Sequence, residues 1–131
     1  MLKKNKNNKK TGFQNPFHQG ETESQMRAGV GAELSAIAKV AITKFMPEAH
    51  QHFFSKLPFV VVAAKDKQNN IWSSFLTGDV GFINIHNKHE FSINAQFLDI
   101  DPLANQAQFG NEIGLLGIQF ETRRRSRVSA K

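Results

Sequence analysis

The chain has 131 residues, the length of a single domain, and its 17 lysines and arginines outnumber 11 acidic residues, for a formal net charge of +6. The absence of cysteine excludes disulfides, thiolate nucleophiles and thiolate metal sites, and it favours a cytoplasmic location. No run of 18 apolar residues is present, so the sequence predicts no membrane-spanning helix and no membrane partner.

The basic charge is concentrated at the two ends of the chain. Residues 1–10 hold five lysines, and residues 122–131 hold four arginines and one lysine, without an acidic residue in either segment. The remaining residues 11–121 carry seven basic and eleven acidic groups, a balance of −4. Nucleic-acid binding usually needs a broad basic surface, so this distribution argues against it. Residues 1–15 lack the apolar stretch of a secretory signal, and we expect a solvated, disordered tail there.

Helices are predicted first along the chain, within a domain that we expect to span residues 16–131. A short helix is expected from about Thr22 to Arg27 and a third from Pro47 to about Leu57, where proline suits the first turn. Between them, Ala32–Phe45 is predicted to be helical because apolar residues recur at three- and four-residue steps. These residues are Leu34, Ile37, Ala41 and Phe45.

Strands are predicted from residue 58 onward. Phe59–Ala64 is rich in valine, Ile71–Thr77 is a second extended segment, and the polar residues 65–70 between them complete a β-hairpin. Val80–Ile85 and Phe91–Phe97 are expected to pair around residues 86–89.

A short helix is expected from Asp101 to Gly110, followed by a last strand. Five or more strands with short connections favour a mainly β fold, with an antiparallel sheet or barrel.

The last strand is predicted to run from about Ile113 into the arginines. If residues 116–128 are extended, Arg124 shares a face with Ile118 and Phe120, while Arg123 and Arg125 point the other way. A guanidinium that faces the interior needs an anionic partner, and a phosphate fits its forked donors. The alternative is that the strand frays after Phe120 and the arginines form a solvated terminus.

A second group of polar residues follows Trp72. Ser74 and Thr77 supply hydroxyls, the indole supplies a flat face, and Gly78 allows a ligand to approach the backbone closely. This set suits a planar heteroaromatic ligand that carries a phosphate; the alternative is an ordinary core strand and turn.

No catalytic or metal-binding pattern is present. His50 and His52 lie two residues apart on a predicted helix, so they cannot face one metal ion, and His86 and His89 flank a turn without further ligands. Neither a Ser-His-Asp order, nor a pair of carboxylates, nor a phosphate loop indicates a catalytic residue.

Four segments follow one another along the chain: PFHQGE (16–21), LPFVVVAAKDKQNNIWSSFLTGDVGF (57–82), DPL (101–103) and GLLGIQFETRRRSRV (114–128). In this order they resemble the flavin-nucleotide-binding proteins of the pyridoxamine 5′-phosphate oxidase-like group. The resemblance implies an antiparallel, Greek-key-like FMN-binding split β-barrel preceded by N-terminal helices. It also implies a homodimer with flavin at the subunit interface. Members of this group continue for further strands, so the barrel is expected to be incomplete in this chain.

The resemblance also implies which residues bind the cofactor. Those along the flavin would be Trp72, Ser73, Ser74, Leu76, Thr77 and Gly78, and those near its polar groups Arg123, Arg124 or Arg125. The cofactor would be FMN, with FAD or a deazaflavin as alternatives, and the protein a flavin-dependent oxidoreductase of unknown substrate. Because a flavin carries the redox chemistry itself, no catalytic side chain is needed.

Two other functions stay open. One is a non-catalytic dimeric split-barrel module with weak or lost flavin binding. The other is a nucleic-acid-binding protein that uses its basic ends.

Overall fold

The computed structural model describes residues 15–104 and 111–131, and the chain divides into two units, one before and one after the boundary between Lys44 and Phe45. Across the described residues it contains three helices and six strands, and all strand pairs are antiparallel. The expected mainly β, antiparallel class is therefore confirmed. The strands form one four-stranded and one two-stranded sheet rather than a closed barrel.

The first unit contains α1 (Gln19–Arg27) and α2 (Gly31–Ala41). Helix α1 begins earlier than predicted because His18 caps it. The Nδ1 atom of His18 accepts the backbone N–H of Glu21, whose carboxylate accepts the N–H of His18 in return, a capping box. Helix α2 ends before the predicted Phe45, because Ile42 already has an extended backbone. The predicted tail lies outside the described residues, apart from Asn15.

The second unit begins with α3 (Glu48–Ser55), for which Pro47 is the N-cap residue. Strands β1 (Phe59–Lys65) and β2 (Ile71–Thr77) form the hairpin that the sequence predicts. Strands β3 (Ile83–Asn87) and β4 (Glu90–Ile93) also pair as expected, although both are shorter than predicted. Residues 101–104 form turns, and most of the helix predicted to end at Gly110 lies outside the described residues.

The arginine-rich end is a hairpin, so the prediction of one continuous strand through residues 116–128 was wrong. Strand β5 (Ile113–Gln119) turns back into β6 (Arg124–Ala130). The backbone N–H of Arg123 donates to the carbonyl of Phe120 at 3.2 Å, and Arg123 adopts a left-handed φ of 55°. The alternative of a frayed end was also wrong, because β6 pairs with β5 along its whole length.

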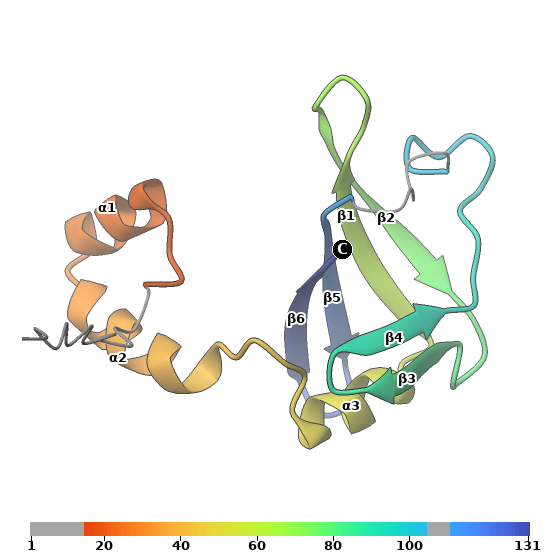
Figure 1. Cartoon of the computed structure of the whole chain (residues 1–131), viewed down its shortest axis with the longest axis horizontal. Coiled ribbons are helices and arrows are strands. Elements are labelled where there is room, and N and C mark those ends of the chain that lie inside the picture. The colour runs from red at the N-terminus through yellow and green to blue at the C-terminus, as the bar shows by residue number, and fades with distance from the viewer. Residues whose placement is uncertain (1–14, 105–110) are drawn as a thin grey trace, which may run out of the picture. The chain divides into compact units, whose positions relative to one another are not determined.

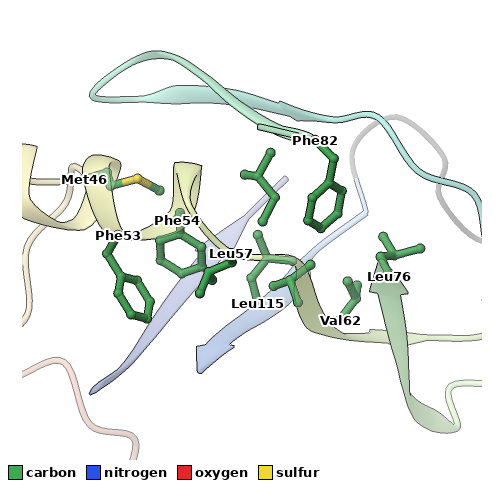
Figure 2. Close-up of a cluster of buried hydrophobic side chains, with 10 residues drawn as sticks. Met46, Phe53, Phe54, Leu57, Val62, Leu76, Phe82 and Leu115 are labelled. Atoms are coloured by element: carbon green, nitrogen blue, oxygen red, sulfur yellow. The ribbon is translucent and has the colours of Figure 1, made fainter. Parts of the chain in front are cut away.

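The larger sheet has the strand order β2-β1-β5-β6, and the described elements of the second unit cover one of its faces (Figure 1). We call the covered side the inner face. Helix α3 and the β3–β4 hairpin pack against it, and Figure 2 shows the apolar side chains that meet there. This core consists of Met46, Phe53, Phe54, Leu57, Val60, Val62, Leu76, Phe82, Ile83 and Leu115.

At Gly117 on β5, side chains of α3 and of the residues after it pack directly on the sheet. A Cβ atom at this position would lie 2.7 Å from Leu57, 2.8 Å from Phe53 and 2.9 Å from Phe54. All three side chains are buried, so none can move aside without disturbing the core. Glycine is therefore required at this position by packing.

We expect Gly117→Ala to lower the free energy of unfolding by about 1–3 kcal/mol, because the added methyl group overpacks the core. Gly114→Ala is the matched control on the same strand, where the nearest atom to an added Cβ, the carbonyl oxygen of Ala63, lies 3.9 Å away. Its stability should equal or exceed that of the unmodified chain. Urea denaturation followed by circular dichroism measures both, and equal losses in the two variants would contradict this account.

Candidate functional site

The opposite side of the four-stranded sheet, which we call the outer face, is an apolar surface that the described elements of the second unit leave open. The register of the strands places on it Ile71, Ser73, Phe75 and Thr77 of β2, Phe59, Val61, Ala63 and Lys65 of β1, Gly114, Leu116 and Ile118 of β5, and Arg125, Arg127 and Ser129 of β6. The side chains of Phe75 and Phe120 are 66% and 72% exposed. Exposed apolar surface of this kind commonly marks a binding site.

An open apolar groove of about 510 Å³ runs over this face. Its lining consists of Pro58, Phe59, Val61, Phe75, Thr77, Ile118 and Phe120, of which Thr77 alone has a polar side chain. The Phe59 ring lies between the other two aromatic rings, 6.0 Å from Phe75 and 5.9 Å from Phe120 between centroids. The volume lies within the range of small-molecule sites. The ring planes are inclined by 42° between Phe59 and Phe75 and by 27° between Phe59 and Phe120, so a flat ligand would stack on one ring at a time.

Arginines of β6 border the groove on one side. Arg125 is the neighbour of Ile118 in the strand register, and Arg127 is the neighbour of Leu116. Leu116 in turn pairs with Val61, and Val61 pairs with Phe75. One row of side chains therefore crosses the sheet from the ring of Phe75 to the guanidinium of Arg127. Adjacent strands lie about 4.8 Å apart, and no strand residue on the outer face is acidic. The face therefore combines apolar rings with two arginines whose neighbours on the strands carry no negative charge.

The neighbouring row across the sheet contains only small side chains. Ser73 pairs with Ala63, Ala63 with Gly114, and Gly114 with Ser129. This row makes the surface beside the groove low and flat. A ligand larger than the groove could extend over it.

The residues predicted from β2 divide between the two faces. Ser73 and Thr77 lie on the outer face, and Thr77 lines the groove. Trp72, Ser74 and Leu76 alternate with them and point to the inner side.

The inner-side residues of β2 have structural partners. Leu76 is buried in the core, and the Ser74 hydroxyl donates to the carboxylate of Asp101. Gly78 packs so closely on Phe82 that a Cβ would lie 2.6 Å from that side chain. These partners account for Ser74, Leu76 and Gly78 without a ligand.

The predicted arginines also separate. The guanidinium of Arg124 lies over the Phe53 ring, 5.5 Å from its centroid, and the residue pairs with Gln119 at the exposed rim of the inner face. The prediction that Arg124 shares a face with Ile118 and Phe120 was therefore wrong, because the turn at 120–123 shifts the alternation. Arg125 lies on the outer face, and Arg123 belongs to the turn itself.

The outer face also includes Arg127, which was not among the residues predicted from the sequence. Strands β2 and β6 are the two edges of the sheet, about 14 Å apart. The predicted hydroxyl and arginine groups therefore do not converge on one point. They could contact only the two ends of an elongated ligand.

Neither a metal cluster nor a spanning helix is found in the described parts of the chain. Residues 15–104 and 111–131 contain no group of three or more histidine, cysteine or acidic side chains that could hold a metal ion. The Nδ1 atom of His50 lies 3.4 Å from the Ser126 hydroxyl, and the Nε2 atom of His86 lies 2.9 Å from that of Ser92. No helix in these residues is long and apolar enough to cross a bilayer.

Comparisons of the chain with protein-family models, with curated proteins and with solved structures found no match.

Trp72 is held by the turn between β1 and β2 rather than by the groove. Its indole N–H donates to the Asp66 carboxylate at 2.8 Å, and the backbone N–H groups of Gln68 and Asn70 donate to the same side chain. The bond from Trp72, helped by those from Asn70 and Gln68, lowers the pKa of Asp66 below its ordinary value against the opposing effect of burial. Asp66 thus fixes both the turn and the indole.

We expect Trp72 fluorescence to report the protonation of Asp66, since Trp72 is the one tryptophan of the chain. Because the folded-state pKa is lowered, the carboxylate stabilises this turn fully above its unfolded pKa of about 3.9. The contribution is lost as the pH falls through the lower folded-state value. Emission should therefore stay constant from neutral pH down to about pH 5 and change below about pH 4.

Asp66→Asn is the matched control for this titration. Asparagine retains a carbonyl oxygen for the backbone N–H groups but has no ionisable carboxylate. Its emission should differ from that of the unmodified chain at neutral pH and lack the acid transition. Far-ultraviolet circular dichroism separates the local change from global acid unfolding. An acid transition in Asp66→Asn equal to that of the unmodified chain would contradict the assignment.

Proposed function

We propose that the chain binds a flavin nucleotide, FMN, on the outer face, and that it acts as a flavin-dependent oxidoreductase with a split-barrel fold. One observation carries the proposal: an aromatic groove beside the Thr77 hydroxyl continues, on the same face, into Arg125 and Arg127. A flavin nucleotide needs these two chemistries in this order, because its planar ring is largely apolar and its phosphate is an anion at the end of a flexible ribityl chain.

The groove and the arginines are spaced for such an elongated ligand. A flavin ring stacked on Phe59 leaves Arg127 two strand spacings away, and one stacked on Phe75 leaves it three away, about 10–14 Å. The two arginines can form forked, charge-assisted hydrogen bonds to a phosphate there. Among the predicted cofactor residues, the proposal retains Ser73, Thr77 and Arg125, and it adds Arg127.

The four segments that resemble the pyridoxamine 5′-phosphate oxidase-like group support the same ligand class. In the proposal FMN supplies the redox chemistry when bound, and the chain binds the ring, positions the phosphate and keeps water from the ring face. FAD and a deazaflavin carry a similar ring and phosphate, so the same residues would serve them. The residues that cover the open side of the flavin ring would then determine which substrate binds.

In this proposal the protein is a homodimer, and the second copy covers the open side of the flavin. A ligand in this groove would otherwise have one face in water, and the exposed Phe75 and Phe120 would stay uncovered. A partner would bury these rings and complete the barrel that one chain leaves open. The alternative, a dimeric module without flavin, uses the same contact and differs only in ligand binding.

Purified chain should bind FMN with a change in the flavin absorbance band and quenching of its fluorescence. Arg127→Ala and Arg125→Ala should each raise the dissociation constant about tenfold or more, because each removes a charge-assisted hydrogen bond to phosphate. Arg124→Ala is the matched control, since this arginine lies on the same strand with its guanidinium over Phe53. Its FMN affinity should stay within about twofold, a difference of less than 0.5 kcal/mol.

The absence of any FMN binding would refute the flavin proposal. Equal losses in Arg124→Ala and Arg127→Ala would refute the assignment of the phosphate to the outer face. Riboflavin, which lacks the phosphate, separates the two halves of the ligand. Its affinity should be lower than that of FMN and insensitive to Arg127→Ala.

A further inference from the structure

We infer that the outer face also binds single-stranded nucleic acid, with bases stacked on its phenylalanines and phosphates on the arginines of β6. The inference is independent of flavin binding, and a single strand would compete with FMN and with a second copy of the chain for the same surface. It comes from side chains that are already in place: three aromatic rings, two arginines and a flat row of small residues.

Phe59, Phe75 and Phe120 form an aromatic cluster on an open antiparallel sheet, which we call the platform, with ring planes inclined by 42° between Phe59 and Phe75 and by 27° between Phe59 and Phe120. Their centroids are spaced at about 6 Å, and two of the three side chains are more than half exposed. Unpaired bases present flat faces that stack on such rings, whatever their sequence, and sheets that carry exposed aromatic residues bind single strands in this way. A double helix keeps its base faces stacked internally, so it cannot use the platform.

Arg125 and Arg127 supply the phosphate contacts beside the platform. They are two residues apart on one strand and therefore point the same way, about 7 Å from each other along β6. This separation allows each guanidinium to contact a different phosphate. Neither arginine has an acidic neighbour among the strand residues of the outer face.

The acidic balance of residues 11–121 argued against nucleic-acid binding, but the structure shows where these acidic residues lie. The acidic residues that give positions 11–121 a balance of −4 lie elsewhere than on the strands of the outer face. A stacking platform also needs few cations, because the bases supply much of the affinity. With two phosphate contacts, the logarithm of the association constant should fall with the logarithm of salt concentration with a slope of only about −1.4.

Fluorescence anisotropy of a labelled oligothymidylate with the full chain tests the inference, with unlabelled oligothymidylate as competitor to exclude binding of the dye. The expected result is saturable binding with the shallow salt slope and a clear preference over a duplex of the same length. Phe75→Ala and Phe120→Ala should each weaken binding about tenfold, the usual effect of losing one stacked base. Leu98→Ala is the control, because this side chain is 74% exposed but lies outside the outer face.

A second set of full-length variants separates the platform from the basic end of the chain. Replacing Lys3, Lys4, Lys6, Lys9 and Lys10 by glutamine removes the lysine charges of residues 1–10 and changes no residue of the outer face. This variant should keep its preference for single strands and its sensitivity to Phe75→Ala. Circular dichroism confirms that each variant is folded before its affinity is compared.

Several outcomes would overturn the inference. These are no binding, equal binding of duplex and single strand, affinity that the phenylalanine variants leave unchanged, and affinity that disappears with the five lysines. Binding to vesicles of anionic phospholipid without binding to the oligonucleotide would assign the face to a membrane surface instead. An FMN titration on the same samples distinguishes the two proposals, because FMN binding without oligonucleotide binding leaves the flavin proposal standing. If both ligands bind, each should displace the other.

Discussion

The packing of α3 on Gly117 is the contact on which the second unit depends. Because this position has no side chain, Phe53, Phe54 and Leu57 reach the backbone of β5 and bring one helix against the centre of the sheet. Across the strand pair, Gly117 faces Ser126, another small residue, and the His50 ring of α3 lies beside its hydroxyl. The β3–β4 hairpin then covers the remaining apolar part of the same face. The described elements of this unit that cover the sheet, α3 and the β3–β4 hairpin, are therefore on one side.

The uncovered outer face is a consequence of this one-sided packing. A sheet with β-branched and aromatic residues on both faces normally has a layer on each side. Here the second layer is missing among the described residues of the second unit, and the apolar side chains it would cover stay exposed. The arginines of β6 have a second effect at this surface, since charged side chains on an edge strand oppose uncontrolled pairing with other sheets. Ligand or partner binding would use the exposed rings without requiring a change in the core.

Two hairpins show how much of this fold the sequence predicts. The β1–β2 hairpin was predicted because a polar segment interrupts two clearly extended runs. The β5–β6 turn was missed because residues 120–123 contain no glycine, proline or asparagine, and Arg123 adopts a left-handed conformation that is uncommon for its residue type. Because this turn was not predicted, Arg124 was assigned to the wrong face. The position of Arg125 and Arg127 beside the groove was not expected either.

The candidate site was predicted only in part for a related reason. Alternation along β2 separates Ser73, Phe75 and Thr77 from Trp72, Ser74 and Leu76, but it cannot say which set is covered. Phe75 and Leu76 are both apolar, and the choice between them depends on where α3 and the second hairpin pack. The partners of Trp72 and Ser74, Asp66 and Asp101, come from turns whose geometry the local pattern does not specify. Long-range packing therefore decided which of the predicted residues lie on the outer face.

Flavin and single-stranded nucleic acid place the same demand on the outer face, a planar ring next to a phosphate. Arg125 and Arg127 would serve either ligand, because a guanidinium next to apolar side chains is weakly hydrated and pairs well with phosphate. Selection between the ligands must therefore come from the shape of the surface under the ring. The row of Ser73, Ala63, Gly114 and Ser129 offers a flat extension for a wide ring, whereas the phenylalanines offer successive positions for small ones. A larger side chain in place of Ala63 would thus discriminate against the flavin ring more strongly than against a single base.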